Sequence, residues 1–578
     1  MRLTRVILLL VSLLGSGICL FQMYERPLWR YLPLFLFTFL WIIVIFSQER
    51  WVLRSQINIR WLLLSILSAI LLTTGFPPYI FFIGTAIGFI PLMVLEREIF
   101  SIYGKSRPVV LWRYLFATFW MWNIFTTFWV ANAALIAGLF ANVVNAALMT
   151  LPWIIFHVLC RRNFHWWRYI ILAALWIGFE YLHTHWELSW PWLTLGNCMG
   201  AAFRFAQWYQ YTGHFGGSVW LWALNIAGYY IMSGSVKQKT YLTGVFLLIL
   251  LIPCTFSYYL YNTYPLQKPT MEVTIIQPNF EPHYEKFSVP EADQLAKMLR
   301  LGEEAVTPHT QLIVLPETVF DPVNLDDFYH ANQYPGKITR LLRIAPQAHI
   351  LLGVGGYHTF QKDPGRASIR ESDGIYYEVY NAALMIDKDT SEVQEYYKSK
   401  FVPGAEIFPY KDILPFLKPI VRKLGGTYEG FAPQDRPTNF TCDSIQVAPI
   451  ICYESIYGEW VSGYVRSGAS LLAIITNDGW WDNTPGYKQH LDLGRLRAIE
   501  NRRDIVRSAN TGISCFINQR GDITQRADYG KDAALNGKVA INHTLTFYSR
   551  YGDWIIWVVA VCGITVLILN YFLFLREK

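Results

Sequence analysis

The sequence is poor in charged residues. Only 16% of its 578 residues are Asp, Glu, Lys or Arg, whereas 53% are hydrophobic. A soluble domain of ordinary composition carries about 25% charged residues, so the composition argues against a wholly soluble chain and favours lipid as part of the solvent. The charges are also unevenly distributed. Residues 1–262 are almost continuously apolar, whereas residues 270–548 have the charges, turn residues and short Val/Ile runs of a soluble domain.

Cysteine is scarce and scattered. The eight cysteines form no CxxC pair and no Cys/His cluster with the spacing of a metal site, which argues against a disulfide framework or a zinc domain. Five lie in or beside apolar segments, where a cysteine is usually a small buried apolar residue. The soluble region holds the other three, Cys442, Cys452 and Cys515. We expect no metal and no cofactor.

The net charge of +7 does not indicate a nucleic-acid-binding protein. Such proteins concentrate Lys and Arg on one face of a soluble domain. Here many of the basic residues lie in short loops between apolar segments, which is a signal of membrane topology. The expected partners are therefore membrane lipids, and no nucleic acid.

Ten apolar segments are candidates for membrane spans, each of which needs about 20 residues. The two short ones at 61–75 and 79–95 are separated by Gly75-Phe76-Pro77-Pro78, and they are either two spans or a re-entrant pair. The sequence predicts a bundle of about nine spans at 1–262, a soluble domain at 270–548, and a last span with a short tail at 553–578. The predicted spans are 4–22, 30–47, 61–75, 79–95, 114–131, 134–159, 168–185, 217–233, 241–261 and 554–575.

The basic residues predict the orientation of these spans. If Met1 lies in the cytoplasm, fourteen Lys and Arg residues flank the spans on the cytoplasmic side and four flank them on the other. Nine spans then place the soluble domain outside the cytoplasm. The fourteen are Arg2, Arg5, Arg50, Arg54, Arg60, Arg97, Lys105, Arg107, Arg113, Arg161, Arg162, Arg168, Lys237 and Lys239, and the four are Arg26, Arg30, Arg204 and Lys268.

Two features of the predicted bundle each have two interpretations. The outer segment from Trp186 to Gly216 begins with an aromatic run that ends at Trp192. It is either an aromatic belt at the membrane interface or a surface segment that guides lipid toward the soluble domain. Glu180 falls in the seventh predicted span, where a carboxylate is costly and marks a candidate site; alternatively, it lies at the bilayer edge.

The soluble region alternates strands with amphipathic segments. Amphipathic patterns at 291–304 and 455–467 predict helices between some of the strands, and the alternation favours a layered α/β domain. The predicted strands are 273–276, 311–315, 350–354, 382–386, 445–451 and 471–475.

At three predicted strand ends the sequence has polar residues that no structural role requires. They are Glu317, after Leu315-Pro316; Lys398, which is followed by Pro403 and Glu406; and Cys452, where a strand meets a predicted helix start. A thiol needs a base or a positive field to become a nucleophile, and a carboxylate in a dry site can take its proton. A lysine ammonium and a backbone N–H can stabilise the oxyanion that forms after attack.

This ordered set resembles the nitrilase (carbon–nitrogen hydrolase) superfamily with its Glu-Lys-Cys triad. The fusion to a helical bundle and a terminal helix resembles the bacterial apolipoprotein N-acyltransferase family within it, from about Trp61 onward. Further matching segments are 127–130, 179–182, 191–193, 380–381, 477–480, His490, 495–500 and 507–512.

The resemblance implies an α-β-β-α sandwich and a role for each site residue. Glu317 is the expected general base, Lys398 the oxyanion stabiliser and Cys452 the nucleophile, and Glu406 orients the lysine or the substrate amine. The expected supporting residues are Asn381, Tyr453, Glu454 and Trp480.

The resemblance also implies a ping-pong reaction. An acyl chain passes from a phospholipid, typically phosphatidylethanolamine, to Cys452. It then passes to the α-amine of the diacylglyceryl-cysteine that begins an apolipoprotein. The expected location is the bacterial cytoplasmic (inner) membrane, with the catalytic domain on its outer, periplasmic face.

Two departures from the family pattern and three rival interpretations are left open. Residues 1–60 add two spans, and Lys286-Phe287 stands where the family tends to have a tryptophan. A membrane-bound amidase would use the same three residues but pass the acyl group to water, and a scaffold or transporter would use none of them. A disulfide from Cys452 to Cys442 or Cys515 would remove the nucleophile.

Overall fold

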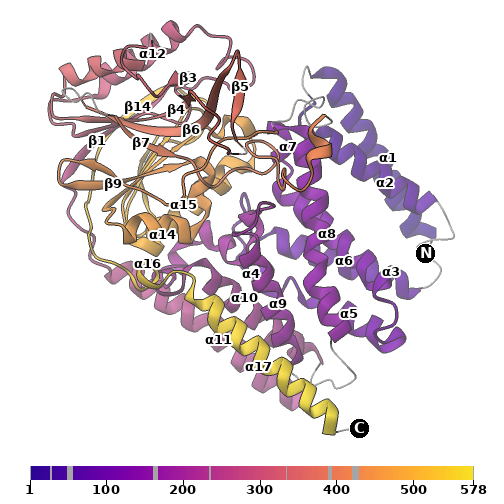
Figure 1. The fold of residues 1–578 in the computed structure, drawn as a ribbon. Coiled ribbons are helices and arrows are strands. Elements are labelled where there is room, and N and C mark those ends of the chain that lie inside the picture. The colour runs from indigo at the N-terminus through magenta and orange to yellow at the C-terminus, as the bar shows by residue number, and fades with distance from the viewer. Residues whose placement is uncertain are drawn as a thin grey trace.

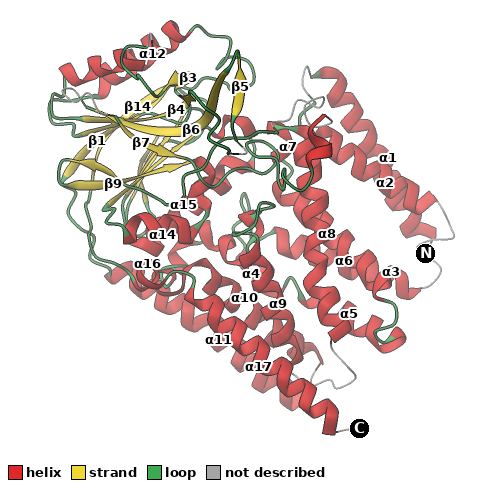
Figure 2. Cartoon of the chain, viewed as in Figure 1, coloured by secondary structure: helices red, strands yellow, loops and turns green. Residues whose placement is uncertain are grey.

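A computed structural model describes residues 2–26, 29–47, 56–159, 167–233, 236–332, 335–366, 368–387, 393–419 and 428–576. Long helices form a bundle, and all the strands gather in one domain at one end of it (Figures 1 and 2). The start of α1 (Arg2–Glu25) and the end of α17 (Trp554–Arg576) both lie away from that domain (Figure 1).

Helices occupy all ten predicted spans. Four of them are long and apolar enough to cross a membrane, namely Val6–Glu25, Leu135–Leu159, Lys237–Thr263 and Trp554–Phe572. The chain is therefore a membrane protein. Between α1 and α17, the bundle helices are α2 (Leu32–Ser47), α3 (Gln56–Thr73), α4 (Phe82–Ile87), α5 (Ile90–Tyr103), α6 (Pro108–Thr127), α7 (Val130–Ala133), α8 (Leu135–Leu159), α9 (Arg168–Leu182), α10 (Tyr209–Ser233) and α11 (Val236–Thr263).

The predicted span at 79–95 is two helices, α4 and α5, that continue to Tyr103. The break falls at Gly88, where a Cβ would lie 2.7 Å from Leu72 Cδ2, and the next amide, of Phe89, donates to Asn225 Oδ1 (2.8 Å). Close packing and a side-chain acceptor thus replace the regular helical hydrogen bonds. Hydropathy does not record either of these contacts.

Helix α3 and the α4–α5 pair run the length of the bundle. Arg60, near the start of α3, pairs with Glu98 of α5 (2.9 Å) at the end away from the strands. At the other end the Pro77 carbonyl accepts a hydrogen bond from Gln489 of the β-rich domain (2.8 Å). These contacts favour two spans over a re-entrant pair.

The strands form two sheets. The first has the order β14-β1-β2-β4-β6-β5, with β3 beside β4 and β7 beside β6, and the second has the order β13-β12-β11-β10-β9-β8. The strands are β1 (Met271–Gln277), β2 (Leu312–Val314), β3 (Phe320–Asn324), β4 (His349–Phe360), β5 (Arg370–Ser372), β6 (Ile375–Ile386), β7 (Gln394–Tyr397), β8 (Phe440–Cys442), β9 (Ile445–Ile451), β10 (Leu471–Thr476), β11 (Ile505–Ala509), β12 (Cys515–Ile517), β13 (Ile523–Arg526) and β14 (Ala533–Val539).

Helices cover the outer face of each sheet, which confirms the predicted α-β-β-α sandwich. Helix α12 (Glu291–Ala305) and the 3-10 helix η4 (Pro335–Arg343) cover the first sheet and share an apolar core with it. Helices α14 (Gly458–Arg466) and α15 (Pro485–Asn501) lie between the second sheet and the bundle (Figure 1). A second core continues from between the sheets into the bundle, so the two parts are packed as one body.

Residues 189–200 of the outer segment are buried in the protein. Residues 191–205 fold into short 3-10 helices, and Trp190 and Trp192 are only 7% and 4% exposed. The expectation of an aromatic belt is therefore wrong for these two residues, and so is that of a surface segment. Glu180 is also buried, and its carboxylate accepts hydrogen bonds from Trp176 Nε1 (2.8 Å) and the Leu195 amide (2.9 Å). Its carboxylate therefore ties α9 to the segment that contains Leu195.

Basic residues gather at the end of the bundle away from the strands, as the topology argument predicts. Arg97 contacts Tyr229 there, and Arg168 begins α9. Arg30, predicted on the opposite side, pairs with Asp482 of the β-rich domain. Arg50, Arg54, Arg161 and Arg162 lie outside the described residues.

Candidate active site

Two carboxylates, a lysine and an amide form one hydrogen-bonded group. Lys398, directly after β7, donates to Oε1 of Glu317 (3.2 Å) and of Glu406 (2.6 Å). Asn381 of β6 donates to the same two oxygens at 2.8 and 3.2 Å. The amide of Asn477, directly after β10, donates to Glu317 Oε2 (3.1 Å). Residues from four separate regions of the sequence therefore meet where the sheets face each other.

Tight packing between the sheets positions Glu317. A Cβ on Gly353 of β4 would lie 2.7 Å from the Glu317 Cα and 3.0 Å from Ile475 of β10. Glycine thus lets the turn that carries the carboxylate lie directly against the neighbouring strand.

Cys452 lies at the tip of β9 in an unusual backbone conformation. Its φ is 48°, a left-handed value that costs a non-glycine residue about 1–3 kcal/mol and that clusters at functional sites. The helix that begins there is the 3-10 helix η6 (Cys452–Ile456) rather than the predicted α-helix, and α14 begins only at Gly458. The sharp turn directs the chain away from the strand at the thiol.

Charged groups of both signs, Glu317 and Lys398, act on the Cys452 thiol. Burial raises the pKa of the Cys452 thiol and the negative charge of Glu317 raises it further, while Lys398 opposes both. Burial alone would lower the pKa of Lys398, but attraction to Glu317 and Glu406 raises it well above its usual value. Both shifts favour the protonated form of the group concerned, so a thiolate at Cys452 requires a base.

Glu454 links the turn that begins at Cys452 to β7, the strand that precedes Lys398. Its Oε1 accepts hydrogen bonds from the Tyr396 hydroxyl (2.6 Å) and the Ser399 amide (2.8 Å), and its Oε2 accepts one from the Ile451 amide (3.0 Å). Burial raises the pKa of Glu454 to about 7. This residue contacts the supports of the site rather than the group around Lys398.

Tyr453 faces the bundle. Its hydroxyl donates to the Ser189 carbonyl (3.2 Å), and its ring lies 5.9 Å from that of Trp192. Trp192 in turn packs against Trp129 (4.8 Å) and Trp481 (5.5 Å). An aromatic cluster from the bundle thus supports the turn that carries Cys452.

Trp480, one of the expected supporting residues, is only partly buried. Its ring packs against His283 (5.3 Å) and the largely exposed Phe287 (6.4 Å). The adjacent Lys286 is buried and donates to the Val319 carbonyl (2.7 Å), so it anchors the segment that carries Phe287. Trp481, which the sequence argument did not single out, is the tryptophan that packs beneath the site.

A row of buried, hydrogen-bonded side chains lies beside the Cys452 backbone, and the sequence alone predicted no role for it. His490 Nε2 lies 3.1 Å from the Cys452 carbonyl and 2.8 Å from the Ser455 hydroxyl, and His490 Nδ1 lies 2.9 Å from Asp478 Oδ1. Arg507 donates to Asp478 Oδ2 (2.6 Å). Burial and the Arg507 guanidinium lower the pKa of His490. The only sequence signal was that these residues fall in segments matching the family.

The described residues allow a disulfide at Cys452 and a metal site to be tested. Cys442, Cys452 and Cys515 are all free, so Cys452 is not locked in a disulfide. Among the described residues, no group of three or more His, Cys, Asp or Glu side chains is arranged to hold a metal ion.

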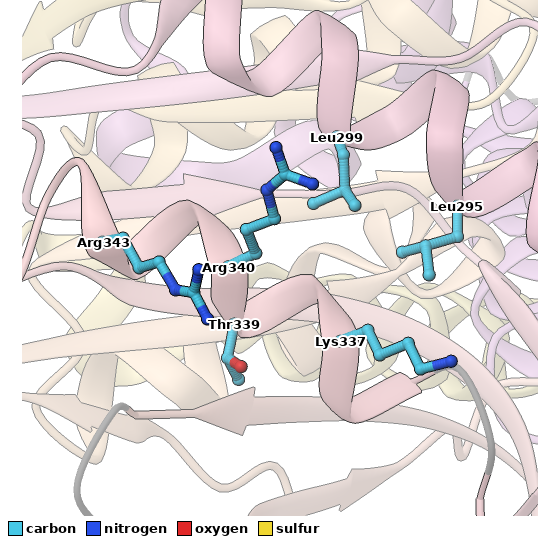
Figure 3. A pocket seen from close by; sticks show the side chains of 6 residues that line it. All are labelled: Leu295, Leu299, Lys337, Thr339, Arg340 and Arg343. Carbon is cyan, nitrogen blue, oxygen red and sulfur yellow. The ribbon is translucent and has the colours of Figure 1, made fainter.

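A cavity of about 310 Å³ lies on the far side of the first sheet, between α12 and η4 (Figure 3). Its lining combines two leucines with exposed basic side chains. It lies outside the first sheet, whereas the group around Lys398 lies between the two sheets, so the cavity is separate from the site. The lining residues are Leu295, Leu299, Lys337, Thr339, Arg340 and Arg343.

Comparison with known proteins matches both parts of the chain. Residues 273–542 match the carbon–nitrogen hydrolase family, and residues 68–227 match the apolipoprotein N-acyltransferase N-terminal domain. Helices α1 and α2 precede both matched regions. The apolipoprotein N-acyltransferase of Chlorobaculum tepidum is 26% identical over 505 residues, which cover 85% of this chain and 92% of that protein.

Two further relatives agree over nearly the same length. The apolipoprotein N-acyltransferase of Geobacter metallireducens is 26% identical over 514 residues, covering 86% of this chain and 92% of its own. That of Azotobacter vinelandii is 27% identical over 518 residues, covering 84% and 91%. With both domains matched in order along one chain, this protein belongs to the apolipoprotein N-acyltransferase family of the carbon–nitrogen hydrolases.

Proposed function

We propose that this protein transfers an acyl chain from a phospholipid, through a thioester on Cys452, to the N-terminal α-amine of diacylglyceryl-modified apolipoproteins. The observation that carries the proposal is the buried group of Glu317, Lys398, Asn381 and Glu406 beside Cys452. It supplies a base, an oxyanion stabiliser and a nucleophile at one point.

The reaction divides into two half-reactions. In the first, Cys452 Sγ attacks the ester carbonyl of the phospholipid while Glu317 takes the thiol proton. The Lys398 ammonium and a backbone N–H after Cys452 stabilise the oxyanion. Collapse breaks the ester bond, the proton on Glu317 goes to the leaving lysophospholipid alcohol, and a thioester is left on Cys452.

In the second half-reaction, the acceptor amine attacks the thioester and gives a proton to Glu317. The resulting oxyanion collapses, an amide forms, and Sγ leaves and recovers its proton. Transfer instead of hydrolysis requires that water be kept from the thioester. The buried site, with Lys398 only 1% exposed, meets that requirement.

The membrane bundle supports a lipid donor and a lipid-modified acceptor. Bringing each acyl CH₂ into water costs about 0.8 kcal/mol, so a site packed against a bundle avoids the cost of extracting a chain. A small-molecule amidase gains nothing from such a bundle. Phosphatidylethanolamine is the donor we propose to test first.

The acyl-enzyme is the first expected outcome. Purified full-length protein incubated with phosphatidylethanolamine should gain the mass of one acyl chain, located on the peptide that contains Cys452. Adding a diacylglyceryl-cysteine peptide should discharge it as an N-acyl peptide, because the amine is the proposed acceptor. An amidase would instead release free fatty acid at a rate that the peptide does not change, and that result would exclude the transferase.

Topology gives a second expected outcome. We propose that the catalytic domain lies on the outer, periplasmic face of the inner membrane, since basic residues collect at the opposite end of the bundle and nine passes precede β1 among the described helices. A reporter active only outside the cytoplasm should be active when fused after Pro269 and silent when fused after Lys578. The reverse pattern would place Cys452 in the cytoplasm and would favour a cytoplasmic-facing amidase.

A further inference from the structure

The main-chain carbonyl of Cys452 is held from one side by two side chains. The Ser455 hydroxyl donates to it at 2.7 Å, and His490 Nε2 lies 3.1 Å from it. In the tautomer that carries its proton on Nε2, the imidazole donates to this carbonyl, and Nε2 also lies 2.8 Å from the Ser455 hydroxyl. Both contacts act on the residue whose left-handed backbone directs the thiol.

The imidazole is itself held in one orientation. Nδ1 lies 2.9 Å from Asp478 Oδ1, and the same carboxylate accepts a hydrogen bond from the Thr476 hydroxyl (2.9 Å) and a charged one from Arg507 (2.6 Å). His490 and Asp478 are completely buried. A side chain with a fixed partner at each ring nitrogen cannot rotate without losing hydrogen bonds, and a buried polar atom left without one costs about 1–3 kcal/mol.

The bundle completes the support. The rings of Trp192 and Trp481 pack against His490 with centroids 6.0 and 5.4 Å away. The imidazole therefore lies between the buried rings of Trp192 and Trp481 and the turn that carries Cys452. His490 thus links Trp192 of the bundle to the backbone of Cys452.

We propose that His490, oriented by Asp478, is a positioning residue that holds the Cys452 carbonyl and so keeps the thiol directed at Glu317 and Lys398. The inference rests on the proposed nucleophilic role of Cys452. Its test, however, measures thiol reactivity and needs no acyl transfer, so the failure of one proposal is distinguishable from the failure of the other.

The experiment compares alkylation of Cys452 by iodoacetamide in folded, full-length variants, measured by mass spectrometry of the peptide that contains it. His490→Leu should slow alkylation about tenfold, the effect of losing one hydrogen bond of ordinary strength. Gln has an amide nitrogen that reaches the position of Nε2, whereas the amide of Asn reaches only that of Nδ1. We therefore expect His490→Gln to retain most of the rate and His490→Asn to be as slow as His490→Leu.

Two further variants sharpen the test. Asp478→Asn keeps the shape but removes the charge that orients the ring, and it should also slow alkylation. His330→Leu, at an exposed position remote from the site, should leave the rate unchanged. Equal rates for the native protein and His490→Leu, or equal rates for the Gln and Asn variants, would overturn the proposal. The Gln and Asn comparison stands even if the leucine variant does not fold.

Discussion

Cys452→Ala is expected to abolish acyl transfer while leaving the protein folded and inserted in the membrane. In the proposed reaction the sulfur carries the acyl group and no other side chain replaces it, so activity should fall by about 10³-fold or more. Alanine fits the site without strain beyond that already present at this backbone position. The measurement is N-acylation of a diacylglyceryl-cysteine peptide by the purified variant.

Two matched controls come from the other cysteines of the same domain. Cys442 and Cys515 are also buried, but they belong to β8 and β12 and not to the turn that follows β9. Their alanine variants should retain activity. Transfer by Cys452→Ala at more than about a hundredth of the native rate would contradict covalent catalysis, whatever the controls did.

Lys398→Met is expected to lower the rate of acyl-enzyme formation by about 10²–10³-fold, the usual effect of removing one electrostatic donor from an oxyanion site. It also removes the cation from between Glu317 and Glu406, which it bridges at 3.2 and 2.6 Å. Breaking a buried ion pair in this way costs about 3–5 kcal/mol of stability. Both the rate of acylation and the melting temperature should therefore fall.

A double variant separates the effect on the acylation rate from the effect on stability. Lys398→Met with Glu406→Gln removes one carboxylate charge along with the ammonium, and it should recover stability without recovering activity. Lys400→Met is the control for loss of a nearby lysine, because the Lys400 ammonium lies over the rings of Tyr457 (5.2 Å) and Trp460 (5.0 Å) and not between the carboxylates. If Lys398→Met formed the acyl-enzyme at the native rate, Lys398 would not be the oxyanion stabiliser.

Most of the architecture could be predicted from local patterns. Apolar length identified every helix that crosses the bundle, and β9 was predicted with its true bounds, because a strand buried on both faces reads as a continuous apolar run. The grouping of Glu317, Lys398 and Cys452 also followed from the sequence. Each of them lies just beyond the end of a strand, namely β2, β7 and β9, and these three strand ends lie close together in the sandwich.

Other features depend on contacts that no local pattern encodes. Hydropathy does not distinguish a tryptophan at a lipid interface from one buried between two domains, because the ring has apolar surroundings in both places. Trp190 and Trp192 were misassigned for that reason. The 3-10 turn after Cys452 and the function of His490 depend on partners far away in the sequence. Asn381, in contrast, was predicted from family likeness and lies among the carboxylates.

The pairing of β1 with β14 has a consequence for how the protein is made. Met271 lies opposite Val539, so the first strand of the catalytic domain is completed by its last. Contacts between residues so far apart form slowly because a long loop must close first. The first sheet therefore lacks its edge strand until nearly the whole chain has been synthesised. Until then β1 has an unpaired edge, which is the surface most prone to wrong association. We therefore expect a truncation before Ala533 to impair biogenesis more than catalysis, even though it removes no residue of the active site.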